Sequence, residues 1–357
     1  MIINNLVLKN YRNYLEEHFE FINGTNILIG DNGEGKTNVL EAIYMASIGR
    51  SFRTNREVEV VKFNEEFGTI DISFDSYGRK QNINYIISSK NKKQIKLNGI
   101  KIKKLSELFG KIFVVKFSPD DMEIIKGEPS TRRKYIDIFL SQIKPQYVYN
   151  LSQYYKVLEQ KNTLLKTERV NPDELDIWNE KLADLNFAIA QDRQEVIHKI
   201  YPHFLKYNLE ISDAKENVKI NYVSQVKELS REEVYQKLKE SVKNDIFKGH
   251  STIGIHRDDY KVIVNDKDIS KYGSQGQIRT AVLSLKLTER ELIQEIKGEE
   301  PILLLDDVLS ELDTNRKEFL INKISTCQVF ITSTDLEKIN LKDNVKVIKI
   351  NQGTIVD

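Results

Sequence analysis

The chain has 357 residues, of which 40% are hydrophobic and 30% charged, and its formal net charge is +1. This length allows one large core or two smaller ones, and no apolar run approaches the roughly 20 residues that span a bilayer. Cys327 is the only cysteine, which excludes an internal disulfide or cysteine-based metal site and favours a reducing, cytoplasmic setting. With so little net charge, any binding of nucleic acid has to come from a local basic patch.

The N-terminal part of the chain predicts an α/β domain. Strands are expected at residues 2–9 and 25–29, and an amphipathic helix should follow the turn at 30–33. The buried stripe of that helix is predicted to consist of Val39, Leu40, Ile43 and Met45. Apolar and polar residues alternate from 69 to 102, and Asn98-Gly99 indicates a hairpin there, because both turn positions require positive φ. We therefore expect an antiparallel sheet in this stretch.

The middle of the chain predicts a helical arm, because residues 130–209 show helical periodicity. Three apolar faces recur, made of Ile136, Phe139, Leu140 and Ile143, then Leu151, Tyr155 and Leu158, then Leu182, Leu185, Ile189 and Val196. The prolines expected near helix boundaries are Pro145, Pro172 and Pro202. Further on we expect a strand, a helix and two more strands at residues 218–223, 232–243, 252–255 and 261–264.

The last hundred residues return to α/β character. Helices are predicted at residues 277–296 and 315–324, and strands at 302–305 and 329–332. The domain organisation that follows is one α/β domain in two parts with an inserted helical arm. Its boundaries are predicted at residues 1–128 and 253–357 for the domain and 129–252 for the arm.

Residues 30–37 match the pattern G-x-x-x-x-G-K-[ST], with an apolar strand before it and a helical pattern after it. Glycines in this pattern let backbone N–H groups turn inward on a β-phosphate, and the helix presents its positive end to the anion. Lys36 would contact the β- and γ-phosphates of ATP, and the Thr37 hydroxyl would be a ligand of Mg²⁺. The alternative is a glycine-rich turn that binds nothing. The predicted ATP-binding residues are Arg12, Asn13, Gly30, Asp31, Asn32, Gly33, Glu34, Gly35, Lys36, Thr37 and Asn38.

A short apolar strand at residues 302–305 ends in two carboxylates, Asp306 and Asp307. Ligands of parallel sheets lie at the carboxyl ends of strands, which is where both acids are expected. Asp306 is the natural Mg²⁺ partner of Thr37, and Asp307 is placed to orient or activate the attacking water. The alternative is a helix N-cap pair at an ordinary strand end.

A second anion site is predicted at Ser274, Gln275, Gly276 and Gln277, which open a strongly amphipathic helix. Serine caps such a helix, and glycine lets a bulky anion approach the free N–H groups. Two anion sites in one nucleotide-binding chain suit an active site shared head to tail, in which each protomer covers the γ-phosphate held by the other. A plain capped helix is the alternative.

Several short motifs, distributed along most of the chain, together resemble those of a known protein family. Residues 274–277 look like the signature of ABC-type ATPases, and Ser310, Glu311, Leu312 and Asp313 look like their D-loop. More narrowly, the chain resembles the RecF family of bacterial DNA replication and repair proteins, which are SMC-like ATPases. The residues that carry this likeness lie at 11–14, 49–54, 117–121, 132–133, 256–259, 273–277 and 303–313.

The resemblance implies an ABC-type P-loop ATPase head, with a mixed sheet, helices and an antiparallel β subdomain, that dimerises on ATP. It implies a role at gaps where single-stranded DNA meets duplex, where the protein helps to load the recombinase, with the mediators RecR and RecO as partners. ATP hydrolysis would be slow and DNA-stimulated, with Thr332 sensing the γ-phosphate, since no histidine follows that strand. The sequence departs from the family pattern at Ile255, where proline is expected, and at Phe52, where histidine is usual.

Two basic clusters are candidates for DNA contact, the first near the predicted hairpin and the second at the start of the arm. They contain Lys101, Lys103 and Lys104, then Arg132 and Arg133. Solvated protein faces are the alternative, and nothing indicates readout of base edges. Two competing functions are an ABC-type ATPase that drives a membrane or other protein partner, and a small-molecule kinase with the same phosphate loop.

Overall fold

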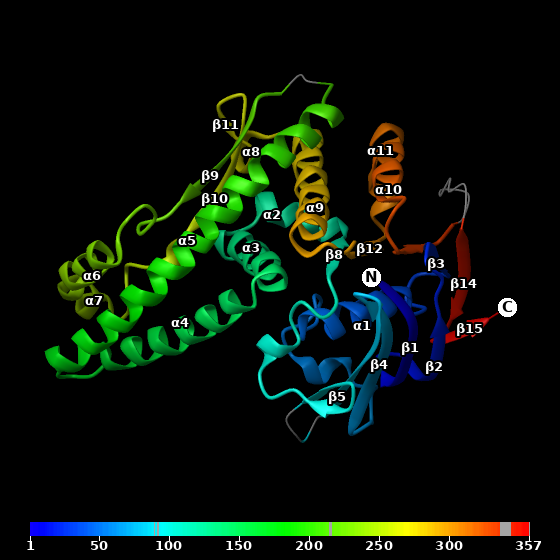
Figure 1. The fold of residues 1–357 in the computed structure, drawn as a ribbon, viewed down its shortest axis with the longest axis horizontal. Helices are drawn as coiled ribbons and strands as arrows, with labels where there is room; N and C mark the ends of the chain where they lie inside the picture. The colour runs from blue at the N-terminus through cyan, green and yellow to red at the C-terminus, as the bar shows by residue number, and fades with distance from the viewer. Residues whose placement is uncertain (89, 91–92, 214–215, 336–343, 357) are drawn as a thin grey trace. The chain divides into compact units, whose positions relative to one another are not determined.

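The structure, a computed structural model, describes residues 1–88, 90, 93–213, 216–335 and 344–356. The chain forms two compact units, Met1–Asp121 with Lys286–Asp357, and Met122–Leu285 (Figure 1). The first is called the head and the second the arm unit. The predicted return to the head at residue 253 precedes the unit boundary at Lys286, and residues 253–285 pack with the arm unit.

Two six-stranded sheets build the head (Figure 1). The first sheet is mostly parallel, in the order β15-β14-β3-β13-β12-β8. Its strands are β3 (Thr25–Ile29), β8 (Val114–Phe117), β12 (Ile302–Asp306), β13 (Val329–Ser333), β14 (Val345–Asn351) and β15 (Thr354–Val356). Because the five strands other than β15 run parallel, their carboxyl ends reach one edge of the sheet.

The second sheet of the head is antiparallel, in the order β2-β1-β4-β5-β6-β7. Its strands are β1 (Ile2–Tyr11), β2 (Tyr14–Glu20), β4 (Phe67–Ser76), β5 (Arg79–Ser88), β6 (Gln94–Leu97) and β7 (Ile100–Lys101). The predicted hairpin is confirmed: Asn98 and Gly99 join β6 to β7 with φ of 50° and 78°. The helical segments of the head are α1 (Lys36–Ile48), η1 (Glu57–Val60), η2 (Leu105–Glu107), η3 (Pro119–Met122), α10 (Val308–Glu311) and α11 (Thr314–Ile324).

Helix α1 contacts strands of both head sheets, among them β13 and β12 of one and β4 and β5 of the other. Every residue from 39 to 48 is buried as a result. The predicted amphipathic helix with a single buried stripe is therefore wrong in that respect, because a helix covered on both sides has no solvent face. The stripe residues Val39, Leu40, Ile43 and Met45 are all fully buried.

The arm unit combines long helices with a three-stranded antiparallel sheet, in the order β11-β10-β9. The helical segments are α2 (Glu123–Lys126), α3 (Pro129–Ile143), α4 (Pro145–Leu164), α5 (Pro172–Ile211), α6 (Arg231–Glu240), α7 (Val242–Lys248), η4 (Ile255–Arg257) and α8 (Ile269–Tyr272). The strands are β9 (Val218–Val223), β10 (Asp259–Val264) and β11 (Lys267–Asp268). Helix α9 (Gln275–Lys297) begins in the arm unit and ends in the head.

Three predictions for the arm are wrong. Pro145 and Pro172 begin helices as expected, but Pro202 lies inside α5, which continues past it. Residues 252–255 form no strand, because Ser251 and Thr252 bond to Asn162 and Asp245 and the chain then turns into η4. Tyr155, predicted to be in an apolar face, is 45% exposed.

The core of the arm unit contains a buried polar cluster around Arg193, whose side chain is fully buried on α5. The guanidinium donates to carboxylate oxygens of Asp137 at 2.8 Å and Asp258 at 2.6 Å. Tyr222 also donates to Asp258, at 2.7 Å. A buried charge is tolerated when it is paired and hydrogen-bonded in this way, so the cluster fixes α3, α5, β9 and the segment before β10 to one another.

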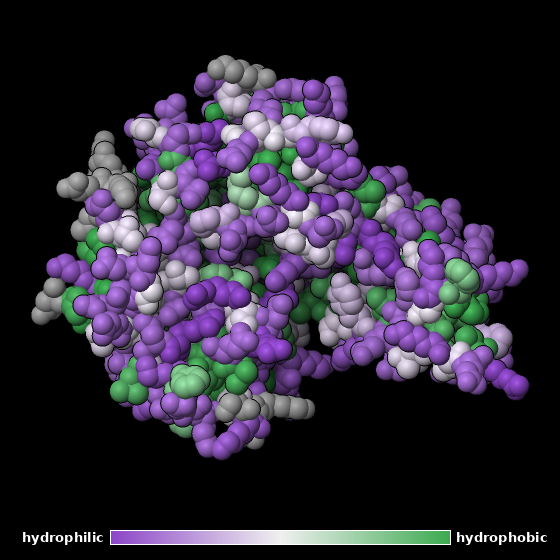
Figure 2. Space-filling model, turned by 180° about the vertical axis from the view of Figure 1, so that it is seen from behind, coloured by the Kyte–Doolittle hydropathy of each residue, from purple (hydrophilic) through white to green (hydrophobic). Residues whose placement is uncertain are grey.

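Hydrophilic side chains cover most of the face drawn in Figure 2, with hydrophobic ones in small groups, as the 30% content of charged residues leads one to expect. Among the described residues, no helix is both long enough and apolar enough to cross a membrane.

Candidate nucleotide-binding site

The phosphate loop connects β3 to α1 at the carboxyl edge of the parallel sheet. Gly35 directly precedes α1 with φ of 119°, and no side chain among the described residues caps the helix there. The first N–H groups of α1 are therefore directed toward the loop without a side-chain acceptor, which is the arrangement that binds an anion. The φ of 119° favours glycine at position 35, and a Cβ there would also lie 2.8 Å from the Asn13 amide nitrogen and 2.8 Å from the Tyr14 hydroxyl.

Lys36 lies inside the loop and is only 4% exposed. Its ammonium group donates to the backbone carbonyls of Gly30 at 2.7 Å and Asp31 at 2.8 Å. These bonds hold a positive charge inside the phosphate loop. The sequence prediction of a phosphate-binding charge at this position is consistent with that placement.

Thr37 and Asp306 meet at the carboxyl edge of the sheet, although they are far apart in sequence. The Thr37 hydroxyl donates to Asp306 Oδ1 at 2.7 Å, and the Thr332 hydroxyl donates to the same oxygen at 2.9 Å. The contact forms because β13 lies between β3 and β12, so that the ends of three neighbouring strands converge. The pair of oxygens is of the kind that hard cations such as Mg²⁺ prefer.

Asp307 follows β12 in a left-handed conformation, with φ of 52°. Its backbone N–H donates to the Thr332 hydroxyl at 2.9 Å, which fixes this turn. Burial, followed by the neighbouring Asp306 carboxylate, raises the pKa of Asp307 above its ordinary value, while Lys36 acts in the opposite direction. A carboxylate with a raised pKa is a better proton acceptor, so the position suits a general base.

Asn13 connects the loop after β1 to the phosphate loop and to α1. Its amide donates to the Glu34 carbonyl at 2.8 Å, and its side-chain oxygen accepts from the Asn38 amide at 2.8 Å. Asn13 and Asn38, both predicted from the sequence, are therefore brought to the phosphate loop. Gly33, Asp31 and Asn32 are exposed on its outer side.

Arg12 is held by Glu41, a residue of α1 that the sequence analysis missed. The guanidinium forms two bonds to the Glu41 carboxylate, at 2.8 and 2.6 Å, and Ser51 donates to the same carboxylate. Glu41 is fully buried. The sequence did contain a signal for this pair, because Glu41 is a lone acid within the apolar run of the predicted helix. A buried carboxylate is nearly always paired with a cation, so a partner could have been sought.

The motif that resembles the signature begins α9, and the motif that resembles the D-loop runs from the end of α10 to the N-cap of α11. Ser274 and Gln277 form a capping box at the start of α9: the Gln277 N–H donates to the Ser274 hydroxyl at 3.2 Å, and the Ser274 N–H donates to Gln277 Oε1 at 3.0 Å. In the head, Asp313 caps α11 by accepting from the Arg316 N–H. Ser274, Ser310 and Asp313 are exposed.

The stretch at 117–121 ends in Asp121, which braces the end of β8 inside the head. Its carboxylate accepts from the Ser118 N–H at 2.6 Å and lies 3.5 Å from the ammonium groups of Lys116 and Lys286. Phe52 packs edge-on against Tyr44, and Lys116 lies over its ring at 4.9 Å. Position 52 therefore has an apolar and cation–π role in this chain.

The stretch at 256–259 holds elements of the arm unit together. Asp258 pairs with Arg193, and Asp259 receives two bonds from Arg132. The Ile255 N–H donates to Asn186 Oδ1 at 2.8 Å, a bond that the family's proline could not make. The departure at this position thus brings its own stabilising contact.

Burial lowers the pKa of His256 to about 4, because the charged ring would lose its hydration. The ring is neutral when folded: Tyr154 donates to Nδ1 at 2.6 Å, and Nε2 lies 3.2 Å from the Ser251 carbonyl, which can only accept. Between the folded pKa and the ordinary value of about 6.5 the unfolded state binds more protons, so stability falls as pH drops through this window.

We therefore expect the thermal unfolding midpoint of wild type to fall between pH 7 and pH 4.5, with a free-energy slope of up to about 1.4 kcal/mol per pH unit from this group. His256→Gln, which keeps a donor near Ser251, should flatten the profile. His198→Gln changes an exposed histidine of α5 and serves as control. Equal slopes in all three proteins would contradict the assignment.

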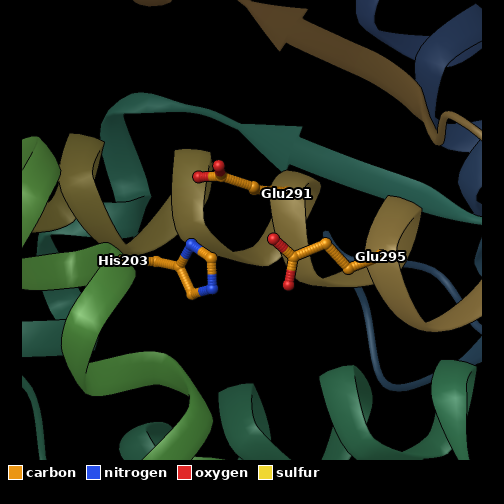
Figure 3. Close-up of side chains that lie close together, drawn as sticks. All are labelled: His203, Glu291 and Glu295. Atoms are coloured by element: carbon orange, nitrogen blue, oxygen red, sulfur yellow. The ribbon is translucent and has the colours of Figure 1, made fainter.

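Two acids one turn apart on α9, Glu291 and Glu295, appear in Figure 3 with His203 of α5. The acids belong to the head and His203 to the arm unit. No metal site is assigned to these three side chains.

The phosphate loop, the acidic strand end and the mixed sheet define the head as an ABC-type ATPase fold. The model of the family described as RecF/RecN/SMC N terminal domain matches residues 2–356. A solved Smc head bound to the C-terminal winged-helix domain of ScpA shares this fold, with a TM-score of 0.54 at 15% identity and coverage of 99% of this chain and 96% of that one.

Relatives of much higher similarity are known. The DNA replication and repair protein RecF of Clostridium novyi is 41% identical, and that of Ruminiclostridium cellulolyticum 42%, each over 99% of both chains. The solved structure of the recombination mediator protein RecF with ATP in the RecFOR pathway has a TM-score of 0.91 at 39% identity, covering 99% of this chain and 98% of that one. The chain belongs to the RecF family.

Proposed function

We propose that this chain binds ATP with Mg²⁺ at the phosphate loop and hydrolyses it slowly. The observation that carries the proposal is the Thr37–Asp306 oxygen pair beside the buried ammonium of Lys36. The two oxygens are 2.7 Å apart. Oxygens in adjacent positions around Mg²⁺ lie about 3.0 Å apart, given Mg–O distances of about 2.1 Å, so a small separation of the pair would accommodate that ion. Bound Mg²⁺ would neutralise charge on the β- and γ-phosphates.

Within this proposal, Lys36 contacts the β- and γ-phosphates and Asp307 accepts a proton from the attacking water. Thr332 is bonded to both Asp306 and the Asp307 backbone, so a change at the γ-phosphate would reach its hydroxyl through these two residues. A hydroxyl at this position provides no positive charge, which supports slow turnover.

The proposal includes a head-to-tail dimer that forms on ATP binding. Residues 274–277 of one protomer would cover the γ-phosphate held by the other, with residues 310–313 at the same interface. The exposure of Ser274 supports this, and so does its capping role. The hydroxyl accepts a bond from Gln277, so its proton is available for a phosphate oxygen.

The dimer would act in the cytoplasm as a DNA-structure-dependent switch in recombinational repair and replication, in the vicinity of single-strand gaps. Family membership supports this role, and RecR and RecO are the partners we propose. For DNA contact, Lys101, Lys103 and Lys104 are exposed in the head. Arg132 and Arg133 instead bond to Asp259 and to the Asp258 carbonyl, so their primary role is within the arm unit.

The proposal is tested by ATP turnover with Mg²⁺ in three conditions: without DNA, with blunt duplex and with gapped duplex. We expect stimulation by duplex, larger with a gap, and a steep loss of that stimulation as salt rises, because phosphate contacts release counterions. Changing Lys101, Lys103 and Lys104 together to alanine should reduce stimulation several-fold while leaving turnover without DNA intact.

Lys80→Ala provides a matched control, since Lys80 is an exposed lysine of β5 in the same sheet. No turnover under any condition would contradict the ATPase assignment. Turnover that is indifferent to all DNA would contradict the DNA-sensing part and direct attention to a protein partner.

A further inference from the structure

The turn between the last two strands of the head lies against the phosphate loop. Strand β14 pairs with β3 in parallel, so both strands end at the same edge of the sheet (Figure 1). After β14 the chain reverses through Gln352 and Gly353 into β15. This two-residue turn is therefore brought to the place where β3 passes into the phosphate loop.

The turn makes two hydrogen bonds to one residue of that loop. The Gln352 N–H donates to the Glu34 carboxylate, and the Gly353 N–H donates to the Glu34 backbone carbonyl at 3.0 Å. The same carbonyl also accepts from the Asn13 amide at 2.8 Å. Glu34 is thus held by the loop after β1 and by the C-terminal turn together.

These contacts are close enough to require glycine. A Cβ at Gly353 would lie 2.8 Å from the carbonyl oxygen of Asn13 and 3.0 Å from its carbonyl carbon, which are backbone atoms that cannot rotate away. A Cβ at Gly30, on the loop side, would lie 2.2 Å from the Ile350 carbonyl of β14. The C-terminal hairpin therefore contacts the backbone of the phosphate loop at two points, Gly30 and Glu34.

Glu34 stands between Gly33 and Gly35, whose φ values are 90° and 119°. Glycines restrain the backbone least of all residues, so the path of this segment has to be fixed by contacts. Its amides converge on a phosphate only if that path is held to within a fraction of an ångström. The bonds to the Glu34 carbonyl supply that restraint.

We propose that Gln352 and Gly353 are positioning residues of the nucleotide site. The C-terminal turn holds Glu34, and through it the amides of the phosphate loop, in the geometry that receives the β-phosphate. The inference rests on the ATP binding proposed above. Beyond that binding, the inference assigns a role to the turn after β14, which contains no residue of the phosphate-loop pattern.

The chain contains a matched control for the test. Gln352 and Gly353 have φ values of 49° and 75°, and Asn98 and Gly99 form the same kind of two-residue hairpin turn with φ of 50° and 78°. A Cβ at Gly99 would meet no atom within 4 Å. Alanine at either glycine therefore strains the backbone to the same degree, but only Gly353→Ala pushes against Asn13.

The experiment is a titration of each full-length protein with ATP and with ADP, in the presence of Mg²⁺, alongside thermal unfolding without nucleotide. We expect Gly353→Ala to weaken both nucleotides about tenfold, because both carry a β-phosphate, while Gly99→Ala stays within twofold of wild type. The unfolding midpoint of Gly353→Ala should lie below that of Gly99→Ala, because only its Cβ meets backbone atoms, so the titrations are made well below both midpoints. Equal nucleotide affinity in the two variants would overturn the inference.

If Gly353→Ala does not fold, two substitutions of Glu34 test the inference instead. Glu34→Ala removes the acceptor of the Gln352 N–H and should weaken ATP and ADP alike, whereas Glu34→Gln keeps an acceptor and should restore most of the affinity. Equal effects of both substitutions would overturn the positioning role. These outcomes can be distinguished from failure of the proposed ATP binding itself, because in that case wild type and Gly99→Ala would bind neither nucleotide.

Discussion

Lys36→Ala is expected to lower the affinity for ATP about 100-fold, because charge-assisted hydrogen bonds to phosphate contribute up to about 3 kcal/mol. The side chain is nearly buried within the loop, so no neighbouring cation can replace it there without rearrangement. Equilibrium titration with ATP and Mg²⁺ measures the loss.

Lys93→Ala is the control for this experiment. Lys93 is also partly buried in the head, and its ammonium donates to a backbone carbonyl, that of Gly49 at 2.9 Å. Its removal should leave ATP affinity within twofold of wild type. Unchanged affinity in Lys36→Ala would refute the phosphate-loop assignment.

Ser274→Arg is expected to abolish ATP-dependent dimerisation while ATP still binds to the monomer. A long side chain would have to enter the proposed interface beside the γ-phosphate, at a position where a serine now stands, and overpacking of that kind costs about 3 kcal/mol. We expect the dimer dissociation constant with ATP to rise at least about 100-fold. Light scattering after size-exclusion chromatography, with and without ATP, gives the oligomeric state.

The arm unit contains a matched site for this substitution. Ser230 begins α6 in a capping box with Glu233, the same local arrangement as Ser274 with Gln277. Ser230→Arg should lose about 1 kcal/mol of stability from the missing cap and dimerise as wild type does. Tight ATP-dependent dimers of Ser274→Arg would contradict the shared active site, and activity retained by such a monomer would favour the kinase alternative.

Much of the site could be predicted from the sequence because its parts are local signals at strand ends. The loop at 30–37 and the acids at 306 and 307 each follow a run of apolar residues, and a parallel sheet brings such ends to one edge. The meeting of Thr37 with Asp306 was predicted from that rule together with the Mg²⁺ chemistry of the phosphate-loop motif, and the structure shows the contact.

Other parts were missed because their roles depend on packing between distant segments. Glu41 sits within an apolar run, and only the fold shows that Arg12 reaches it from the loop after β1. Strands β14 and β15 have mixed polar and apolar residues that indicate no particular register, and β14 becomes ordered as the neighbour of β3. The strand predicted at 252–255 failed for the converse reason, since side-chain bonds to Asp245 compete with sheet pairing.

The helix prediction for 36–48 had the right element and the wrong environment. Periodicity identifies an amphipathic helix by the difference in hydrophobicity between its two faces. The faces of α1 differ little in this respect, because strands of both sheets cover them. Pro202 shows the limit of a boundary rule, since a long helix with tertiary contacts on both sides can continue through one missing hydrogen bond.

The strand order of the parallel sheet has a consequence for biosynthesis. Thr25 of β3 pairs with Val345 of β14, so β3 leaves the ribosome long before the neighbour that closes its side. The other neighbour of β3, β13, is made almost as late, so for most of synthesis both sides of β3 have unpaired N–H and C=O groups, which are prone to wrong pairing with other chains. If the turn after β14 positions the phosphate loop as proposed, a growing chain would bind ATP only after β14 and this turn have been made, and ATP would selectively stabilise chains in which the hairpin has formed.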